Sequence, residues 1–165
     1  WSATHSFSNL REERIRHIIS SVDKSVYVCH LERSLIEQKR IVLFAPPLCH
    51  LETGFKLWVN SIIRLSQELS IPIVIYSDSK SYEAFIQTTN NGKKINYISH
   101  IEYEDWGNYH LLEQQINNND IIVIVMSRKD YLSSNSYFDN LPFKLEKTFD
   151  EHIKIAIYPY QTSNE

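Results

Sequence analysis

The sequence predicts an α/β fold built on an open, doubly wound parallel sheet, and three observations support this prediction. Residues 41–45, 71–76 and 121–126 are short apolar runs rich in β-branched residues, and none alternates with polar residues. Strands that are apolar on both faces belong in the middle of a parallel sheet covered by helices. Amphipathic helical patterns separate these runs. From residue 39 onward strand and helix patterns alternate, which is typical of right-handed βαβ crossovers.

Before Lys39 the sequence predicts one helix and one strand. An apolar stripe from Leu10 to Ile19 indicates the helix, and a strand follows at 26–30. These two elements have no sheet of their own and cannot form a core alone. We therefore expect them to be the end of a preceding domain of similar kind, with 31–38 as the linker.

The first crossover from Lys39 onward is the clearest. Apolar residues recur at helical spacing over 51–69, between the strands at 41–45 and 71–76. Gly54 weakens the first turn of this helix without breaking it. Pro72 cannot donate a ladder hydrogen bond, so we expect it at the first residue of its strand.

The second half of the chain contains weaker patterns around the strand at 121–126. They predict helices at 81–89, 109–116 and 140–149, and strands at 95–98 and 153–158. We expect Asn140 to cap the last helix and Pro142 to lie in its first turn. The strands at 26–30 and 153–158 alternate better than the others, so we expect half-exposed or edge strands there.

Composition excludes several function classes. The 165 residues include three glycines, and neither GxGxxG nor GxxxxGK[ST] occurs, so a Gly-rich phosphate cradle is ruled out. The net charge of −3 does not fit a general nucleic-acid-binding surface. No apolar run approaches the roughly 18 residues that a membrane span needs, so we expect a soluble chain. The chain begins at Trp1 and not at a methionine, so we expect it to belong to a larger protein.

The cysteines do not predict a metal site or a disulfide. Cys29-His30 and Cys49-His50 together offer two Cys and two His, which can hold Zn²⁺. Neighbouring residues on a strand point to opposite faces, however, so Cys29 and His30 would not reach one ion. With no signal peptide at the start, a reducing compartment is the better interpretation. We also expect no catalytic constellation, because GxSxG is absent.

Three aromatic residues invite a choice between core and surface. Phe55 and Trp58 lie on the apolar stripe of the helix at 51–69, so we expect both in the core. Trp106 stands beside Gly107 in a predicted loop, where an exposed contact with a partner is one interpretation.

Five segments carry a resemblance to a known family. They are RIVLFAPP at 40–47, ETGFKLW at 52–58, NDIIVIVMSR at 119–128, LP at 141–142 and IYPYQ at 157–161. Together they resemble the C-terminal cytoplasmic region of bacterial sodium/proton antiporters of the monovalent cation:proton antiporter-2 class. The Glu-x-Gly-Phe-x-x-Trp and Leu-Pro…Tyr-Pro-x-Gln elements are distinctive in combination.

The resemblance implies a domain organisation. That region of the antiporters is similar to two universal-stress-protein-like, Rossmann-like domains in tandem. Residues 1–38 would be the last loop, helix and strand of the first domain plus a linker, 39–161 the complete second domain, and 162–165 a tail. Such domains usually pair antiparallel through their last strands across a two-fold axis. We therefore expect 26–30 to pair with 153–158, within one chain or between two, and a homodimer through these edges.

The resemblance also implies where a ligand would bind, since ligands of open parallel sheets lie beyond the carboxyl ends of the strands. The candidate residues there are Pro46, Ser77, Ser127, Arg128, Lys129 and Ser136. ATP-binding universal stress proteins have an Asp after the first strand and a Gly-rich loop after the fourth. Here Pro46 stands in place of the Asp, and 127–136 contains no glycine. The segment is therefore either a solvated polar loop or an altered nucleotide or small-anion site.

The function implied is a non-catalytic regulatory and assembly domain of a cation/proton antiporter. Its partner would be the transmembrane part of the same protein, its place the cytoplasmic face of the membrane, and it would need no cofactor. A nucleotide-binding sensor of the universal-stress-protein type is the alternative, and a purely structural scaffold that holds a dimer is a third.

Overall fold

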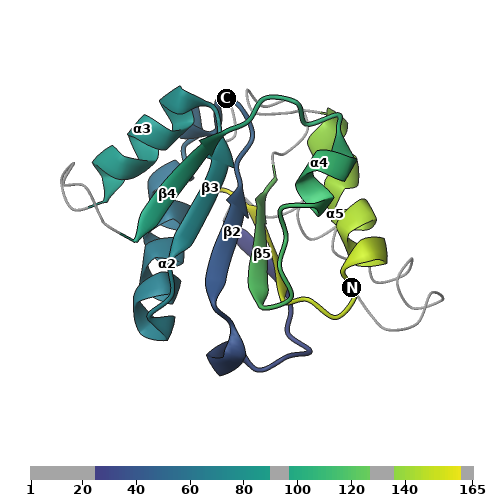
Figure 1. Ribbon diagram of the computed structural model, residues 1–165. Coiled ribbons are helices and arrows are strands. Elements are labelled where there is room, and N and C mark those ends of the chain that lie inside the picture. Colours follow the sequence, from purple (N-terminus) through teal and green to yellow (C-terminus); the bar gives the residue numbers. More distant parts are fainter. Residues whose placement is uncertain (1–24, 90–96, 127–135, 161–165) are drawn as a thin grey trace.

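The computed structural model describes residues 25–89, 97–126 and 136–160, with the backbone alone for Val26 and for 136–140. The helix predicted between Leu10 and Ile19 lies outside these residues. Figure 1 shows an open sheet with helices on both sides. The structure is an α/β fold with a six-stranded, mostly parallel sheet, as the sequence predicts.

The elements follow the predicted alternation from Lys39 onward. The strands are β1 (Val26–His30), β2 (Arg40–Phe44), β3 (Ile73–Ser77), β4 (Ile98–Glu102), β5 (Asp120–Val125) and β6 (Lys154–Tyr158). The α-helices are α2 (Phe55–Leu69), α3 (Ser79–Thr88), α4 (Tyr109–Glu113) and α5 (Ser136–Thr148). Two short 3₁₀ turns, η1 (Leu35–Glu37) and η2 (Cys49–Leu51), precede β2 and α2.

The strand order is β1-β6-β5-β2-β3-β4. All neighbours from β6 to β4 pair in parallel, and β1 pairs antiparallel with β6. The five parallel strands therefore have the order of a doubly wound Rossmann-like sheet. The order reverses between β2 and β5, so the crevice where such folds hold ligands lies at the carboxyl ends of these two strands.

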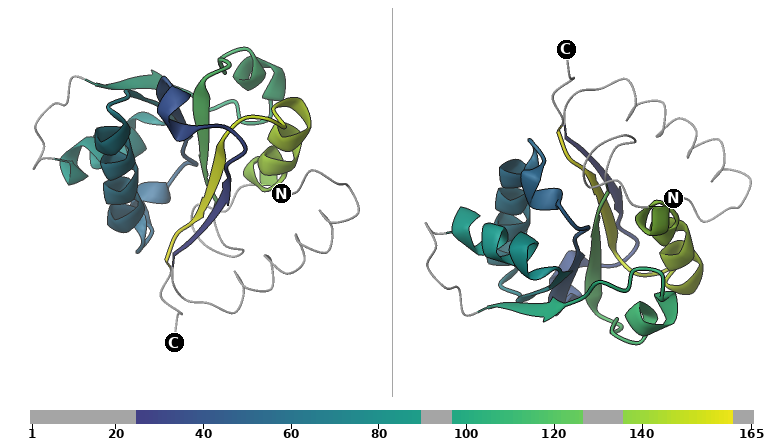
Figure 2. Two further views of the ribbon diagram at one scale, coloured as in Figure 1. Left: turned by 90° about the horizontal axis from the view of Figure 1, so that it is seen from below. Right: turned by 90° about the horizontal axis from the view of Figure 1, so that it is seen from above.

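Helices cover both faces of the sheet, which explains the two-sided apolar strands. On one face α2 and α3 pack against the side chains that begin with Ile41 and Leu43. On the other face α4 and α5 pack against those that begin with Val42 and Phe44. Figure 2 shows the sheet between the two helix pairs. Every residue of β5 is buried, so the prediction of a central strand there is confirmed.

The pairing of β1 with β6 is confirmed, and it occurs within one chain. Val26 stands opposite Tyr158, and the ladder runs to His30 opposite Lys154. The expected edge position is correct for β1 and wrong for β6, because β1 covers the open side of β6. Such cover is what a strand as apolar as β6 requires.

The weak strand predicted at 95–98 is misplaced. Strand β4 starts at Ile98, where the prediction ends, and runs to Glu102. Strand β4 lacks a continuous apolar run, because it is an edge strand with exposed positions. Its sequence pattern was therefore interrupted by the polar residues Ser99, His100 and Glu102.

The predicted start of the last helix is also wrong. Helix α5 begins at Ser136, four residues before the expected cap Asn140. Pro142 therefore lies inside the helix and not in its first turn. It lacks the N–H that would bond to the carbonyl four residues earlier, so this helix has one internal hydrogen bond fewer than its length allows.

Candidate functional site

The carboxyl ends of β2, β3 and β5 form the edge, here called the carboxyl edge, where the sequence places its candidate residues. Pro46 follows β2 and Ser77 ends β3, and the two strands are neighbours, so both residues lie at this edge. Ser136 is the first residue of α5. Ser127, Arg128 and Lys129 lie outside the described residues. The structure thus places two of the six candidates together.

Ser77 is used by the fold itself. Its side chain is fully buried, and its hydroxyl donates to the carbonyl of Asp78 at 2.9 Å. His100 Nε2 lies 2.9 Å from the carbonyl of Ser77 and 3.2 Å from its hydroxyl. Because a carbonyl only accepts, Nε2 of His100 carries the hydrogen. The ring of Tyr82 stacks on the same imidazole, with ring centroids 4.2 Å apart. Ser77 therefore fixes β4 against β3.

Asp78, the next residue, is committed as a helix cap. Its Oδ1 accepts from the Ser81 N–H at 2.8 Å and its Oδ2 from the Ser81 hydroxyl at 2.9 Å. His50 Nδ1 lies 3.3 Å from the same hydroxyl. An Asp three residues before a Ser, at the start of a helical pattern, is the sequence signal that could have predicted this cap. Both carboxylate oxygens are occupied, so Asp78 is a structural group at this edge.

Cys49 lies under this cluster and is chemically protected. It is 2% exposed, and burial raises the pKa of its thiol to about 12. The thiolate is the reactive form of cysteine, so Cys49 is not a nucleophile near neutral pH. Cys29 and Cys49 are both free thiols. Within 25–89, 97–126 and 136–160 no group of three or more His, Cys, Asp or Glu side chains is placed to hold a metal ion.

The first turn of α2 is where a doubly wound fold usually receives an anion, and here the chain itself covers it. Gly54 precedes α2, and a Cβ there would lie 2.5 Å from the backbone N of Tyr160 and 2.7 Å from its carbonyl oxygen. Glu52 lies at the same turn, where its backbone carbonyl accepts a hydrogen bond from the Phe55 N–H. Glu52 is buried and carries a carboxyl group. Helix N-termini attract negative charge, so both features disfavour a phosphate at this position.

The sequence did not predict this contact between Gly54 and Tyr160. It brings together two of the segments that carry the family resemblance, 52–58 and 157–161. The signal was the glycine itself, since a glycine is often found where two backbone segments approach closely.

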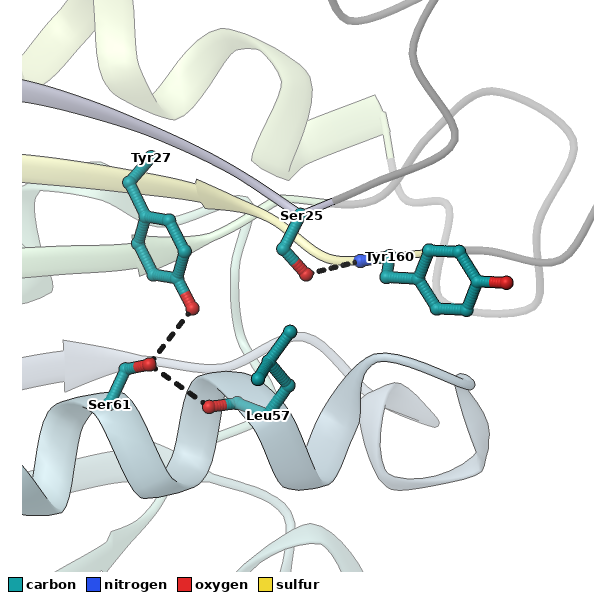
Figure 3. A pocket seen from close by; sticks show the side chains of 5 residues that line it. All are labelled: Ser25, Tyr27, Leu57, Ser61 and Tyr160. Carbon is teal, nitrogen blue, oxygen red and sulfur yellow. Dashed lines mark hydrogen bonds between the residues drawn. The ribbon is translucent and has the colours of Figure 1, made fainter.

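A shallow hollow of about 370 Å³ lies beside this contact, between β1 and α2. It is lined by Ser25, Tyr27, Leu57, Ser61 and Tyr160 (Figure 3). The Tyr27 hydroxyl donates to Ser61 Oγ at 3.1 Å, Ser61 donates to the Leu57 carbonyl, and Ser25 Oγ accepts from the Tyr160 N–H at 2.8 Å. The lining residues are uncharged, and the hydroxyls of Ser25, Tyr27 and Ser61 bond within the protein, so this lining offers no charged side chain to an ion.

Trp106 is not the exposed partner contact that was one interpretation of the sequence. It is 5% exposed and packs edge-on against Tyr103 and Phe44, with ring centroids 4.8 and 6.3 Å away. It therefore belongs to the core under α4 and is not a surface contact. Phe55 and Trp58 are buried as predicted.

No protein-family model and no curated protein sequence matches the chain. Among solved structures, a glucose-6-phosphate 1-dehydrogenase from Mycobacterium avium is similar over 70% of this chain and 28% of its own length, with 14% identity and a TM-score of 0.40. The chain thus spans less than a third of that structure. None of the helices in the described part of the chain combines the length and the apolar character needed to cross a bilayer.

Proposed function

We propose that this chain is a non-catalytic regulatory and assembly domain of a cation/proton antiporter, on the cytoplasmic face of the membrane. One observation carries the non-catalytic half of the proposal. The fold's usual anion position, the first turn of α2, is covered by the backbone of Tyr160, and the neighbouring Ser77 and Asp78 are bonded within the protein.

The antiporter half of the proposal comes from the resemblance in the sequence. Two of the segments that carry that resemblance, 52–58 and 157–161, are in contact at Gly54 and Tyr160. Two short motifs that contact each other in the fold support the resemblance better than two motifs that lie apart. The transmembrane part of the same protein is the partner we propose, and coupling requires that it bind this domain differently in two transport states.

A transport measurement tests the proposal. Everted vesicles would be prepared from cells that produce the full-length protein containing this chain, with and without residues 39–161. We expect the deletion to change the pH profile of cation/proton exchange or the amount of assembled transporter. Thr53→Ala, an exposed change beside Gly54, is the matched control and should behave as the parent. The proposal would be wrong if the deletion left the rate of cation/proton exchange, its pH profile and the protein level unchanged.

A nucleotide-binding sensor is the second candidate. Its basis is the segment after β5, where Arg128 and Lys129 could meet a phosphate and Ser136 could donate a hydrogen bond. The test is thermal unfolding of the chain with ATP, AMP, NAD and cyclic dinucleotides. A ligand at a hundred times its Kd adds about 2.7 kcal/mol, a shift on the order of 5–10 °C for a domain of this size. We expect no such shift. A clear shift that Arg128→Ala abolishes would favour the sensor.

A further inference from the structure

The loop Asn117–Asp120, at the opposite edge of the sheet from the candidate site, is held from three sides. The carbonyls of three successive residues each accept a hydrogen bond from a different part of the chain. Asn117 accepts from His152 Nε2 at 2.9 Å, Asn118 from the Arg33 guanidinium at 2.6 Å, and Asn119 from the Lys39 N–H at 2.8 Å. Two of these donors, Arg33 and Lys39, belong to residues 31–39, the connector between β1 and β2.

Arg33 is the charged side chain of the connector that bonds to this loop. Besides Asn118, its guanidinium contacts Glu151 at 2.9 Å. The Arg33 side chain is 31% exposed and that of Glu151 72% exposed, so water screens this ion pair. The ion pair with Glu151 therefore contributes little to holding Arg33 in place.

His152 is the titratable group placed to supply that charge. It is 7% exposed and directly precedes Ile153 and β6, and its ring makes a T-shaped contact with that of Phe149. The charged groups that act on it are Arg33 from the connector, Lys154 from β6 and Asp120 from β5. Because the Asn117 carbonyl only accepts, Nε2 carries the hydrogen, and protonation would add the second one at Nδ1.

Lys154 cannot move to relieve this charge. Its ammonium group is buried and donates to the carbonyls of Phe149 at 2.6 Å and Asp150 at 3.2 Å, and it pairs with Glu146 at 3.2 Å. Asp120 is equally fixed, since its carboxylate binds the Arg40 guanidinium in two places and the Asn117 N–H. Arg33 is the most exposed of the three charged neighbours and is held by two contacts, so it is the one that a charge on His152 would displace.

We propose that His152, Arg33 and the 117–120 loop form a proton-sensitive latch, in which protonation of His152 releases Arg33 and so breaks the side-chain bond that joins the connector 31–39 to the loop. A positive imidazolium repels the positive charges of Arg33 and Lys154, and Arg33, the more exposed of the two, leaves. Burial is the main cause that lowers the pKa of His152, with Arg33 and Lys154 adding to it and the bond to Asn117 opposing it. The latch is thus closed at neutral pH and opens below the ordinary histidine range, about pH 6.5.

This inference is independent of the proposed transport function and is tested on the isolated chain. The measurement is amide hydrogen exchange of residues 31–39 at about pH 7.5 and about pH 5, corrected for intrinsic rates, together with an NMR titration of the His152 imidazole. We expect protection of the connector to be lost over the same pH range in which His152 titrates, while β2 and β5 stay protected. If His152 titrates and the connector keeps its protection, the latch does not exist.

Two variants sharpen the test. His152→Gln keeps an N–H donor for Asn117 but cannot take a proton, so the connector should stay protected at both pH values. His110→Gln removes an exposed histidine paired with Glu113 and should keep the parent's pH dependence. If His152→Gln does not fold, Arg33→Gln serves instead: it should leave the connector unprotected at both pH values and raise the pKa of His152. A connector that still opens with pH in His152→Gln, or an unmoved titration in Arg33→Gln, would overturn the proposal.

Discussion

At the scale of single residues, Gly54 is the position where the smallest change has a defined consequence. Gly54→Ala would place a methyl group 2.5 Å from the Tyr160 nitrogen, so either α2 or the segment after β6 must shift. We expect a loss of about 1–3 kcal/mol in the free energy of unfolding, as for other overpacked sites. Urea unfolding measures it, and Thr53→Ala should stay within about 0.5 kcal/mol of the parent. Equal stability of the two variants would show that the close approach is not rigid.

The two thiols make a second prediction at this scale. Cys29 is exposed, whereas Cys49 is buried with a pKa raised to about 12. The sulfur of Cys29 is itself partly covered, and this desolvation raises the pKa of its thiol, so the Cys29 thiol should react slowly near neutral pH. We expect a disulfide reagent to modify one thiol in the folded protein and two in urea. The folded Cys29→Ser variant should not react, and rapid labelling of that variant would contradict the buried environment of Cys49.

The candidate residues show what the sequence could and could not predict about a site. The positions of Pro46 and Ser77 at the carboxyl edge followed from the order of strands, because parallel strands end at one edge. What their side chains do there did not follow. The commitment of Ser77 to His100 depends on β4, whose position was wrong, and the cover over Gly54 depends on a contact across more than a hundred residues of sequence.

At the scale of elements, the two strands at the centre of the sheet were easier to place than the polar edge strand β4. Strands β2 and β5, buried on both faces, were placed within a residue or two of their observed bounds. Strand β4 was not, because its edge position allows polar side chains. Helix α5 starts earlier than expected because Pro142, a usual marker of a first turn, is accommodated in the interior of this helix.

The ion pair between Arg40 and Asp120 joins the starts of β2 and β5, and it makes a prediction for these elements. Asp120 is 1% exposed, and its carboxylate contacts Arg40 at 2.7 and 2.8 Å and the Asn117 N–H at 2.7 Å. Asp120→Asn leaves the guanidinium without its counter-ion at a largely buried site, so we expect a loss of about 3 kcal/mol in unfolding free energy. Glu151→Gln breaks the exposed pair with Arg33 and should cost less than about 1 kcal/mol. Chemical denaturation compares the two, and similar losses would contradict this ranking.

At the scale of the whole molecule, the buried His152 makes stability depend on pH. Its pKa is lower in the folded protein than its ordinary value, mainly because of burial, so the unfolded chain binds more protons in the window between the two values. Stability is therefore fully present above about pH 6.5 and is lost as pH falls from there through the folded pKa. Urea unfolding between about pH 8 and about pH 5 should show this decline, and His152→Gln should flatten it. A decline of equal size in His152→Gln would assign it to other groups.

The antiparallel pairing of β1 with β6 has a mechanical consequence. Because Val26 stands opposite Tyr158, and Tyr160 donates to Ser25, the two ends of the described fold leave it side by side. A force that pulls these two ends apart acts across the β1–β6 ladder and not along it. The backbone hydrogen bonds would then break one after another, starting from Ser25, as in the opening of a zipper. A pull on the flanking chain would thus detach β1 first and leave the five parallel strands and their helices intact.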